Sequence, residues 1–241
     1  MSIGQPRLEV CLSPALLHLY DTKDTVVVII DIFRATSTIA AALHNGAKCI
    51  IPVASVAECI SLGTTIENSI TAGERDGKIA EGLQNGNSPL DYPKEFIDGK
   101  TLILTTTNGT RLLHMIQDAE CIITGSFLNL DAVCEFIIKQ GKNVLLGCAS
   151  WKDRVNLEDT LFAGAVVNKV QEHFDINCDS CRLANHLYKC SGEKDFISFL
   201  KDSSHYKRLS AFGLEHDMEY CTSLNLHPVV PILKGRELVV N

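Results

Sequence analysis

The chain has 241 residues, 46% of them hydrophobic, which is enough material for one large core or two small ones. Its formal net charge of −7 argues against a non-specific nucleic-acid binder, because such a protein needs a basic face. The longest apolar run, VVVII at 26–30, is far shorter than the roughly 20 residues of a membrane span, so no membrane association is expected.

The start of the chain, MSIGQPRLEV, lacks a basic stretch followed by an apolar segment and therefore does not resemble a secretory signal. Ten cysteines in such a chain are expected to be reduced thiols, most of them packed as small hydrophobic side chains. A cytoplasmic location is expected. The acidic charge still permits a small, multiply anionic ligand, because a few arginines can create a locally positive site.

Apolar and β-branched segments predict strands along the first two thirds of the chain, at 8–12, 25–31, 48–53, 69–74, 101–106, 120–125 and 143–148. Between most of them lie helical patterns, at 36–46, 55–67, 128–141 and 157–174. Strands that are apolar along their whole length and alternate with helices favour a mostly parallel sheet covered on both faces. The predicted fold class is α/β, with three α/β/α layers.

The pattern changes at about residue 176, where helical and charged segments precede two short strand candidates at 229–233 and 237–240. We predict an α/β sheet core over 1–175 that carries most of the site. A helical C-terminal region, 176–241, is expected to pack back on that core. One compact domain overall is the alternative.

The C-terminal region contains Cys178, Cys181, His186 and Cys190, in the order of a zinc knuckle. The last spacing is one residue short of the usual knuckle, and the intervening RLANHLYK has the pattern of an amphipathic helix. A plain helix with buried thiols is therefore favoured over a zinc site, and the role of this cluster is left open.

Ligands of open parallel sheets bind at the carboxyl ends of the strands, and here five successive strand ends carry polar residues. Arginines, hydroxyls and amides at these ends and in two later loops can hold oxyanions. The segment TTTNGT, which opens a predicted helix, adds backbone N–H groups. A turn or helix cap is the alternative for each. The candidate substrate-binding residues are Arg34, Arg75, Asn87, Ser88, Thr107, Asn108, Gly109, Thr110, Ser126, Asn129 and Arg208.

The same strand ends supply four carboxylates: Asp31, Glu74, Glu158 and Asp159. Hard oxygen ligands among oxyanion donors suit Mg²⁺, which prefers carboxylates together with substrate phosphate. For each acid alone, a salt bridge or a helix cap is the competing interpretation.

Seven patterns occur along the chain in this order: VVVIIDIFRATSTI, AGERDG, GNSPLDY, TTTNGTRLL, GSFLN, LEDTLFAG and SSHYKRL...G...D...C, which ends at Cys221. In these patterns and their order the chain resembles the 2-phosphosulfolactate phosphatase family from about residue 25 to 221. The resemblance implies an α/β/α fold and a Mg²⁺-dependent hydrolase that converts 2-phospho-3-sulfolactate to 3-sulfolactate and phosphate. In archaeal methanogens this step belongs to coenzyme M biosynthesis. Family members also occur where coenzyme M is not made.

We expect Mg²⁺ to sit on Asp31 with Glu158 or Asp159 and to orient an attacking water, with Glu74 or Glu158 as the base. Two schemes compete: Asp31 as a nucleophile, although residue 33 is Phe and not a second Asp, and Cys148 as a nucleophile, although no Cys-x5-Arg loop follows it. The alternative functions are a phosphatase of another small phosphorylated hydroxy acid and a non-catalytic sensor of such an anion. A homo-oligomer is left open.

Overall fold

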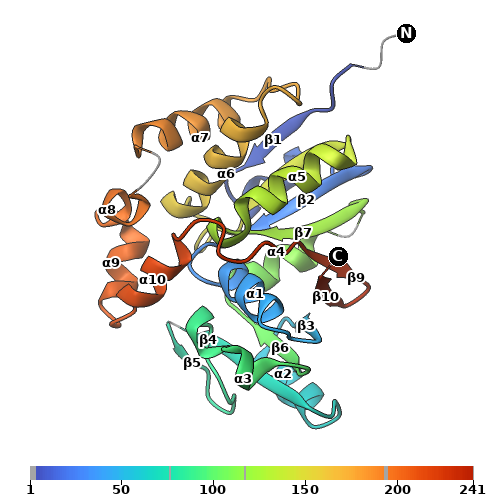
Figure 1. The fold of residues 1–241 in the computed structure, drawn as a ribbon, viewed down its shortest axis with the longest axis vertical. Helices are drawn as coiled ribbons and strands as arrows, with labels where there is room; N and C mark the ends of the chain where they lie inside the picture. The colour runs from blue at the N-terminus through green and yellow to red at the C-terminus, as the bar shows by residue number, and fades with distance from the viewer. Residues whose placement is uncertain (1–3, 76, 117, 193–194, 241) are drawn as a thin grey trace.

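The computed structural model describes residues 4–75, 77–116, 118–192 and 195–240. Within these residues one sheet has the strand order β1-β8-β2-β7-β9-β10-β3-β6-β4-β5 (Figure 1). Every predicted strand is confirmed, and the two-residue β5 is an addition. The strands are β1 (Leu8–Cys11), β2 (Thr25–Ile30), β3 (Cys49–Pro52), β4 (Ser69–Arg75), β5 (Lys78–Ile79), β6 (Thr101–Thr105), β7 (Cys121–Gly125), β8 (Asn143–Cys148), β9 (Pro231–Lys234) and β10 (Glu237–Val240).

The sheet consists of two parallel halves joined by an antiparallel hairpin. One half contains β1, β8, β2 and β7, and the other contains β3, β6 and β4. Strands β9 and β10 lie between them, where β9 pairs with β7 and β10 pairs with β3. The end of the C-terminal region therefore completes the middle of the sheet. The division of the chain at residue 175 stays a prediction.

Helices cover the sheet on both sides, and the four long predicted helices are confirmed with shorter ends. The segment predicted at 55–67 stops at Gly63, and the one predicted at 157–174 stops at Val170. The helices are α1 (Ala35–His44), α2 (Val56–Gly63), α3 (Lys94–Ile97), α4 (Gly109–Met115), α5 (Leu130–Gln140), α6 (Leu157–Val170), α7 (Asp179–Cys190), α8 (Phe196–Leu200), α9 (Ser204–Ser210) and α10 (Glu215–Cys221). Short 3₁₀ turns cover Pro14–Leu19, Pro89–Asp91 and Phe127–Asn129.

The fully buried strand β2 explains how one sequence builds two cores. Val26, Val28 and Ile30 pack in the core cluster that contains α5 and α6. Val27 and Ile29 point to the other face and pack in the cluster that contains α1 and α4. Alternation in a strand that is apolar on both sides requires helices on both faces. The predicted α/β class is confirmed.

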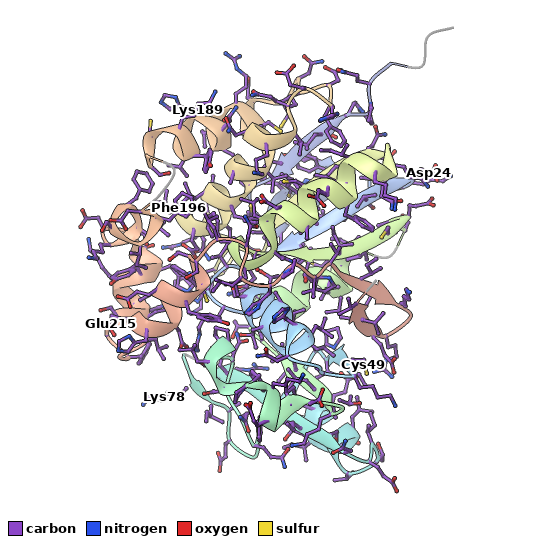
Figure 2. The ribbon with its side chains drawn as sticks, in the orientation of Figure 1. Asp24, Cys49, Lys78, Lys189, Phe196 and Glu215 are labelled. Carbon is purple, nitrogen blue, oxygen red and sulfur yellow. The ribbon has the colours of Figure 1, made fainter. Side chains whose placement is uncertain are left out.

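The C-terminal helices attach to the first face of the sheet through aromatic packing. Phe196, labelled in Figure 2, begins α8 and stacks on Phe127 with ring centroids 4.6 Å apart. Phe127 in turn meets Phe162 of α6 edge to face at 5.3 Å. These contacts hold α8, α9 and α10 beside the carboxyl ends of the parallel strands. Among the described residues, no helix combines the length and apolar character that crossing a membrane requires.

Helices α6 and α7 cross at Gly164, where a Cβ atom would lie 2.0 Å from the carbonyl oxygen of Ala184. Because backbone on the facing helix cannot rotate away, we expect Gly164→Ala to lower the free energy of unfolding by about 1–3 kcal/mol. Urea denaturation measures the loss. Gly147→Ala is the matched control, because a Cβ there meets nothing closer than 3.4 Å. Equal stability of the two variants would contradict the close crossing.

Candidate active site

A cavity that opens to solvent lies at the carboxyl ends of the parallel strands. The loops after β2, β4, β6 and β8 supply most of its walls, and α9 closes one side. It is lined by Asp31, Phe33, Arg34, Glu74, Gly77, Asn87, Thr106, Thr107, Asn108, Trp151, Lys152, His205, Arg208, Leu209 and Phe212. The structure thus brings together seven predicted site residues: Asp31, Arg34, Glu74, Asn87, Thr107, Asn108 and Arg208.

Asp31 follows β2 directly and is almost completely buried. Its carboxylate accepts a hydrogen bond from the backbone N–H of Ala35 at the start of α1. Burial raises the pKa of Asp31 to about 6, helped by the charges of Glu74 and Glu158 and opposed by His205. Gly109 leaves room for this carboxylate, because a Cβ there would lie 2.9 Å from Asp31 Oδ2. The glycine of TTTNGT therefore permits a close approach.

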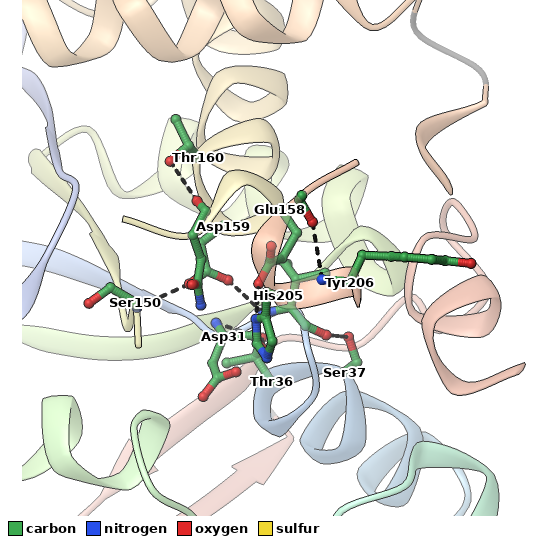
Figure 3. Close-up of polar contacts among 12 residues, drawn as sticks. Asp31, Thr36, Ser37, Ser150, Glu158, Asp159, Thr160, His205 and Tyr206 are labelled. Atoms are coloured by element: carbon green, nitrogen blue, oxygen red, sulfur yellow. Dashed lines mark hydrogen bonds and ion pairs between the residues drawn. The ribbon is translucent and has the colours of Figure 1, made fainter. Parts of the chain in front are cut away.

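The first turn of α6 places two further carboxylates behind Asp31 (Figure 3). Glu158 Oε1 lies 2.5 Å from His205 Nδ1 of α9, and both side chains are buried. Glu158 Oε2 is buried without a hydrogen-bond partner among the described residues. A buried His–Glu pair with one unpartnered oxygen is typical of a functional site, since such an oxygen is costly to leave unpaired.

Asp159, unlike Glu158, uses both of its carboxylate oxygens to accept hydrogen bonds from the backbone. Its Oδ1 accepts from the backbone N–H of Ile32 at 2.9 Å, and its Oδ2 accepts from that of Ser150 at 3.1 Å. Burial, with the charges of Glu158 and Asp31, raises its pKa well above the usual value for an aspartate, against the two N–H groups. Asp159 thereby ties the loops after β2 and β8 together.

Glu74 fixes the loop after β6. Its Oε1 accepts from the backbone N–H and the hydroxyl of Thr107, at 3.2 and 2.9 Å, and its Oε2 accepts from the N–H of Gly77 at 3.1 Å. The Thr107 hydroxyl is therefore engaged by protein. Arg75 does not line the cavity: its guanidinium donates to the carbonyl of Glu74 at 2.6 Å and to Thr105 Oγ1 at 3.3 Å.

Arg34 and Ser88 share a buried partner. The Arg34 guanidinium pairs with Asp217 of α10, and the Ser88 hydroxyl donates to the other Asp217 oxygen at 2.8 Å. Ser88 and Asp217 line a neighbouring hollow that also reaches Arg34 and Asn87. The Oδ1 of Asn87 is buried without a hydrogen-bond partner among the described residues, and Asn87 lines the cavity as well. Asp217 thus orients Arg34 from behind.

Trp151 and Lys152 of the loop after β8, together with Arg208 of α9, form a positively charged corner of the cavity. The guanidinium carbon of Arg208 lies 3.8 Å from the ring centre of Trp151, and Lys152 Nζ lies 4.6 Å from the same ring. An indole face attracts cations, so one aromatic ring holds two positive groups beside the cavity. Lys152 and Asp153 adopt positive φ angles of 50° and 62°, so the loop makes a tight turn directly after Trp151.

Three predicted substrate-binding residues lie away from the cavity in the described structure: Arg75, Ser126 and Asn129. Ser126 and Asn129 follow β7 but are buried, and the N–H and hydroxyl of Ser126 both donate to Asn129 Oδ1. Asn129 Nδ2 donates to the carbonyl of Val229 at 2.8 Å, which holds the C-terminal segment. The side chain of Thr110 lies outside the described residues.

Cys148 is fully buried at the end of β8, and burial with neighbouring negative charge raises its pKa well above that of a free thiol. It does not line the cavity. A nucleophile must reach its substrate as a thiolate, so this position does not support the cysteine scheme.

Sequence reasoning missed the lining residues Trp151, Lys152, Leu209 and Phe212, and it noted Phe33 at a strand end and His205 beside Arg208 without assigning either to the site. The rule that found Asp31 would also have found Trp151 and Lys152, because they follow the end of β8 by only three and four residues. His205 lies three positions before Arg208, a spacing that puts both on one helix face. Asp217 is the aspartate of the pattern SSHYKRL...G...D...C, but sequence reasoning assigned it no role.

Metal-binding clusters are absent from the described residues, which contain no group of three or more His, Cys, Asp or Glu side chains arranged to hold an ion. Asp31, Glu158 and Asp159 therefore do not form a three-ligand set with their present side-chain positions. The zinc knuckle is not formed either, because Cys178 to Cys190 span the start and end of helix α7.

Comparison with known proteins gives a consistent result. The family model described as 2-phosphosulpholactate phosphatase matches residues 11–236. A probable 2-phosphosulfolactate phosphatase of Thermotoga petrophila is 45% identical over 206 residues, covering 86% of this chain and 88% of the relative. The probable 2-phosphosulfolactate phosphatases of Caldanaerobacter subterraneus and Clostridium acetobutylicum are 38% and 35% identical, over 217 and 220 residues, covering 89% and 90% of this chain and 90% and 93% of the relatives.

Proposed function

The chain belongs to the 2-phosphosulfolactate phosphatase family and is a phosphatase, and we propose that it hydrolyses the phosphate ester of 2-phospho-3-sulfolactate with the help of Mg²⁺. The products are 3-sulfolactate and inorganic phosphate. The substrate carries a phosphate, a sulfonate and a carboxylate on a short carbon skeleton, so its pocket has to offer several cations within a small volume.

One observation carries the proposal: Arg34, Lys152 and Arg208 line the same cavity as Asp31. Three basic groups favour a multiply charged anion over a neutral ester. Asn87 and Asn108 add neutral donors. The carboxylate of Asp31 repels the anion unless a cation lies between them, which a simple anion-binding sensor would not require. The arrangement therefore supports a phosphatase with a divalent ion.

Mg²⁺ suits two carboxylates, that of Asp31 in the cavity wall and that of the nearby buried Glu158. Burial and neighbouring carboxylates raise the pKa of Asp31 to about 6, and Glu158 Oε2 is buried without a hydrogen-bond partner in the part of the chain that the structure describes. Mg²⁺ commonly takes one or two protein carboxylates and fills its other positions with water and substrate phosphate. We assign Asp31 and Glu158 as the protein ligands, since both oxygens of Asp159 already accept N–H groups. The bound ion would polarise the phosphoryl group.

The side chains of the chain itself position the substrate and move the proton. Arg34, held by Asp217, would grip the phosphoryl oxygens, and the stacked pair Lys152 and Arg208 would bind the remote acid groups. Glu158 holds His205 through Nδ1, which leaves Nε2 for proton transfer to or from the reacting oxygens. In this scheme Glu74 shapes the loop of Thr107, and His205 replaces the carboxylates as the base.

The decisive experiment is a phosphate-release assay that compares 2-phosphosulfolactate, 2-phospholactate and phosphoglycerate, each with Mg²⁺ and with EDTA. We expect turnover with Mg²⁺ only, and the highest kcat/KM for the sulfonated ester. Equal rates on all three would replace the named substrate with small phosphorylated hydroxy acids in general. Full activity in EDTA would remove the metal from the proposal, and ligand-induced thermal stabilisation without turnover would leave only a sensor.

The stacked cations provide a prediction about substrate affinity. Because Lys152 contributes charge and not chemistry, Lys152→Met is expected to raise KM for 2-phosphosulfolactate about 10-fold with little change in kcat. Steady-state kinetics measure both constants. Lys201→Met, which removes an exposed lysine away from the cavity, serves as the control and should leave KM unchanged. A Lys152→Met variant with unchanged KM would show that this corner does not touch the substrate.

A further inference from the structure

Helix α7 begins with two cysteines that the proposed reaction does not use. Cys178 is the N-cap residue, and Cys181 is the third residue of the helix. Neither lines the cavity. Cys178 is half-buried and within reach of solvent, whereas Cys181 is fully buried and its thiol donates to the carbonyl of Leu8 in β1 at 3.3 Å. The pair therefore combines one accessible sulfur with one protected sulfur.

The surroundings give the two thiols opposite character. A hydrogen bond from the Cys181 thiol is the largest cause that lowers the pKa of Cys178, to about 5 despite partial burial. Hydrogen bonds from the backbone N–H groups of Val10 and Cys181 and from the Ser180 hydroxyl act in the same direction. The Cys178 sulfur and burial raise the pKa of Cys181 far above the usual value. A thiolate is the reactive form of cysteine, so Cys178 is nucleophilic at neutral pH and Cys181 keeps its proton.

Their spacing also permits a bond between the two sulfurs. Positions three apart on an α-helix have Cα atoms about 5 Å apart, within the range of about 4.4–6.8 Å that disulfides span. The backbone of Cys178 is extended, with φ −101° and ψ 129°, so this residue is not locked into helical geometry. Closing the bridge therefore needs adjustment at the helix end only.

We propose that Cys178 and Cys181 form a redox-active dithiol that exchanges with low-molecular-weight disulfides. The Cys178 thiolate attacks one sulfur of the small disulfide, and the other sulfur leaves as a thiolate that takes up a proton. Cys181 then gives up its proton and attacks the Cys178 sulfur, which releases the second small thiol. Two electrons pass from the protein to the small disulfide, one of the two protons comes from Cys181 and the other from solvent, and the protein gains one internal disulfide.

The other exposed thiol of this helix provides an internal comparison. Cys190 lies at the far end of α7, exposed, with its sulfur 3.5 Å from His186 Nε2. Cys190 is nine positions from Cys181, which is too far along a helix for a bridge. With a small disulfide, Cys190 can reach only a mixed disulfide, whereas the proposed pair continues to an internal one.

Peptide mass spectrometry tests the proposal directly. The folded protein is incubated with oxidised glutathione over a range of ratios to reduced glutathione, quenched with acid, treated with N-ethylmaleimide and digested with trypsin. Cleavage after Lys169 and Arg182 yields peptide 170–182, which contains Cys178 and Cys181 and no other cysteine. We expect this peptide to lack maleimide and to be lighter by two hydrogen atoms. A peptide with two maleimides, or with glutathione adducts, under conditions that modify Cys190 would overturn the proposal.

Single variants separate the two sulfurs. Cys181→Ser is expected to stop at a mixed disulfide with glutathione on Cys178, and Cys178→Ser to leave the buried Cys181 unmodified. In the reduced wild-type protein, iodoacetamide at about pH 6 should alkylate Cys178 faster than Cys190. Equal rates would remove the nucleophilic role of Cys178. None of these readouts depends on phosphate release, so the outcome is independent of the proposed phosphatase reaction.

Discussion

Phosphate release by the Asp31→Asn variant is expected to be lower by about 10³-fold, with the fold intact. The amide has nearly the same shape and can still accept the N–H of Ala35, but it cannot supply the charge that the proposed metal ion needs. Initial rates at saturating Mg²⁺ measure the effect. Asp202→Asn, which changes an exposed carboxylate near the C-terminal helices, should retain full activity. An Asp31→Asn enzyme with near-normal turnover would refute the assigned centre.

The same substitution is expected to stabilise the protein, with a defined pH dependence. The folded-state pKa of Asp31, about 6, lies above its ordinary value of 3.8, so the folded state binds the extra proton between these values. The contribution of Asp31 to stability is therefore complete below about pH 4 and is lost as the pH rises through about 6. At pH 8 without metal, Asp31→Asn should have a free energy of unfolding higher by up to about 3 kcal/mol, and the difference should vanish near pH 4.

The strands were predictable because buried strands of a parallel sheet are continuous apolar runs in the sequence. Val26 to Ile30 cannot form a half-exposed strand, so this segment alone required helices on both faces. The hairpin of β9 and β10 was recognised as two strands, but its position between β7 and β3 was not. Single residue pairs attach it on each side, Ile232 with Ile123 and Leu238 with Ile50, and such distant pairings leave no local pattern.

The site was predictable where a polar side chain lies at a strand end that faces the cavity. Asp31, Glu74 and Asn108 satisfy this rule, and all three line the cavity. Ser126 and Asn129 also follow the end of β7, but Ser126 donates to Asn129 Oδ1, and Asn129 Nδ2 donates to the carbonyl of Val229 in the C-terminal segment. The segment is 100 residues away in sequence at Val229, so only the folded chain reveals the competition.

Two roles remain distinguishable for Glu158: an anchor for His205 and a ligand for Mg²⁺. Its Oε1 contacts His205 Nδ1, and its Oε2 has no hydrogen-bond partner among the residues described, so one carboxylate can serve both roles. If the anchor role dominates, Glu158→Gln and His205→Asn remove the same proton-transfer step. Each is then expected to lower kcat by about 10²–10³-fold, and the double variant to be about as slow as either single variant.

The double-mutant cycle should be accompanied by the pH profile of kcat and by activity measured against Mg²⁺ concentration. In the anchor case, both single variants lose the limb of the profile that depends on proton transfer, and the Mg²⁺ concentration for half-maximal activity stays near that of the wild type. If the losses instead multiply, and Glu158→Gln alone needs more Mg²⁺, then Glu158 acts chiefly on the metal and His205 works independently of it. Circular dichroism of each variant is the control, because both side chains are buried and a folding defect would also lower kcat.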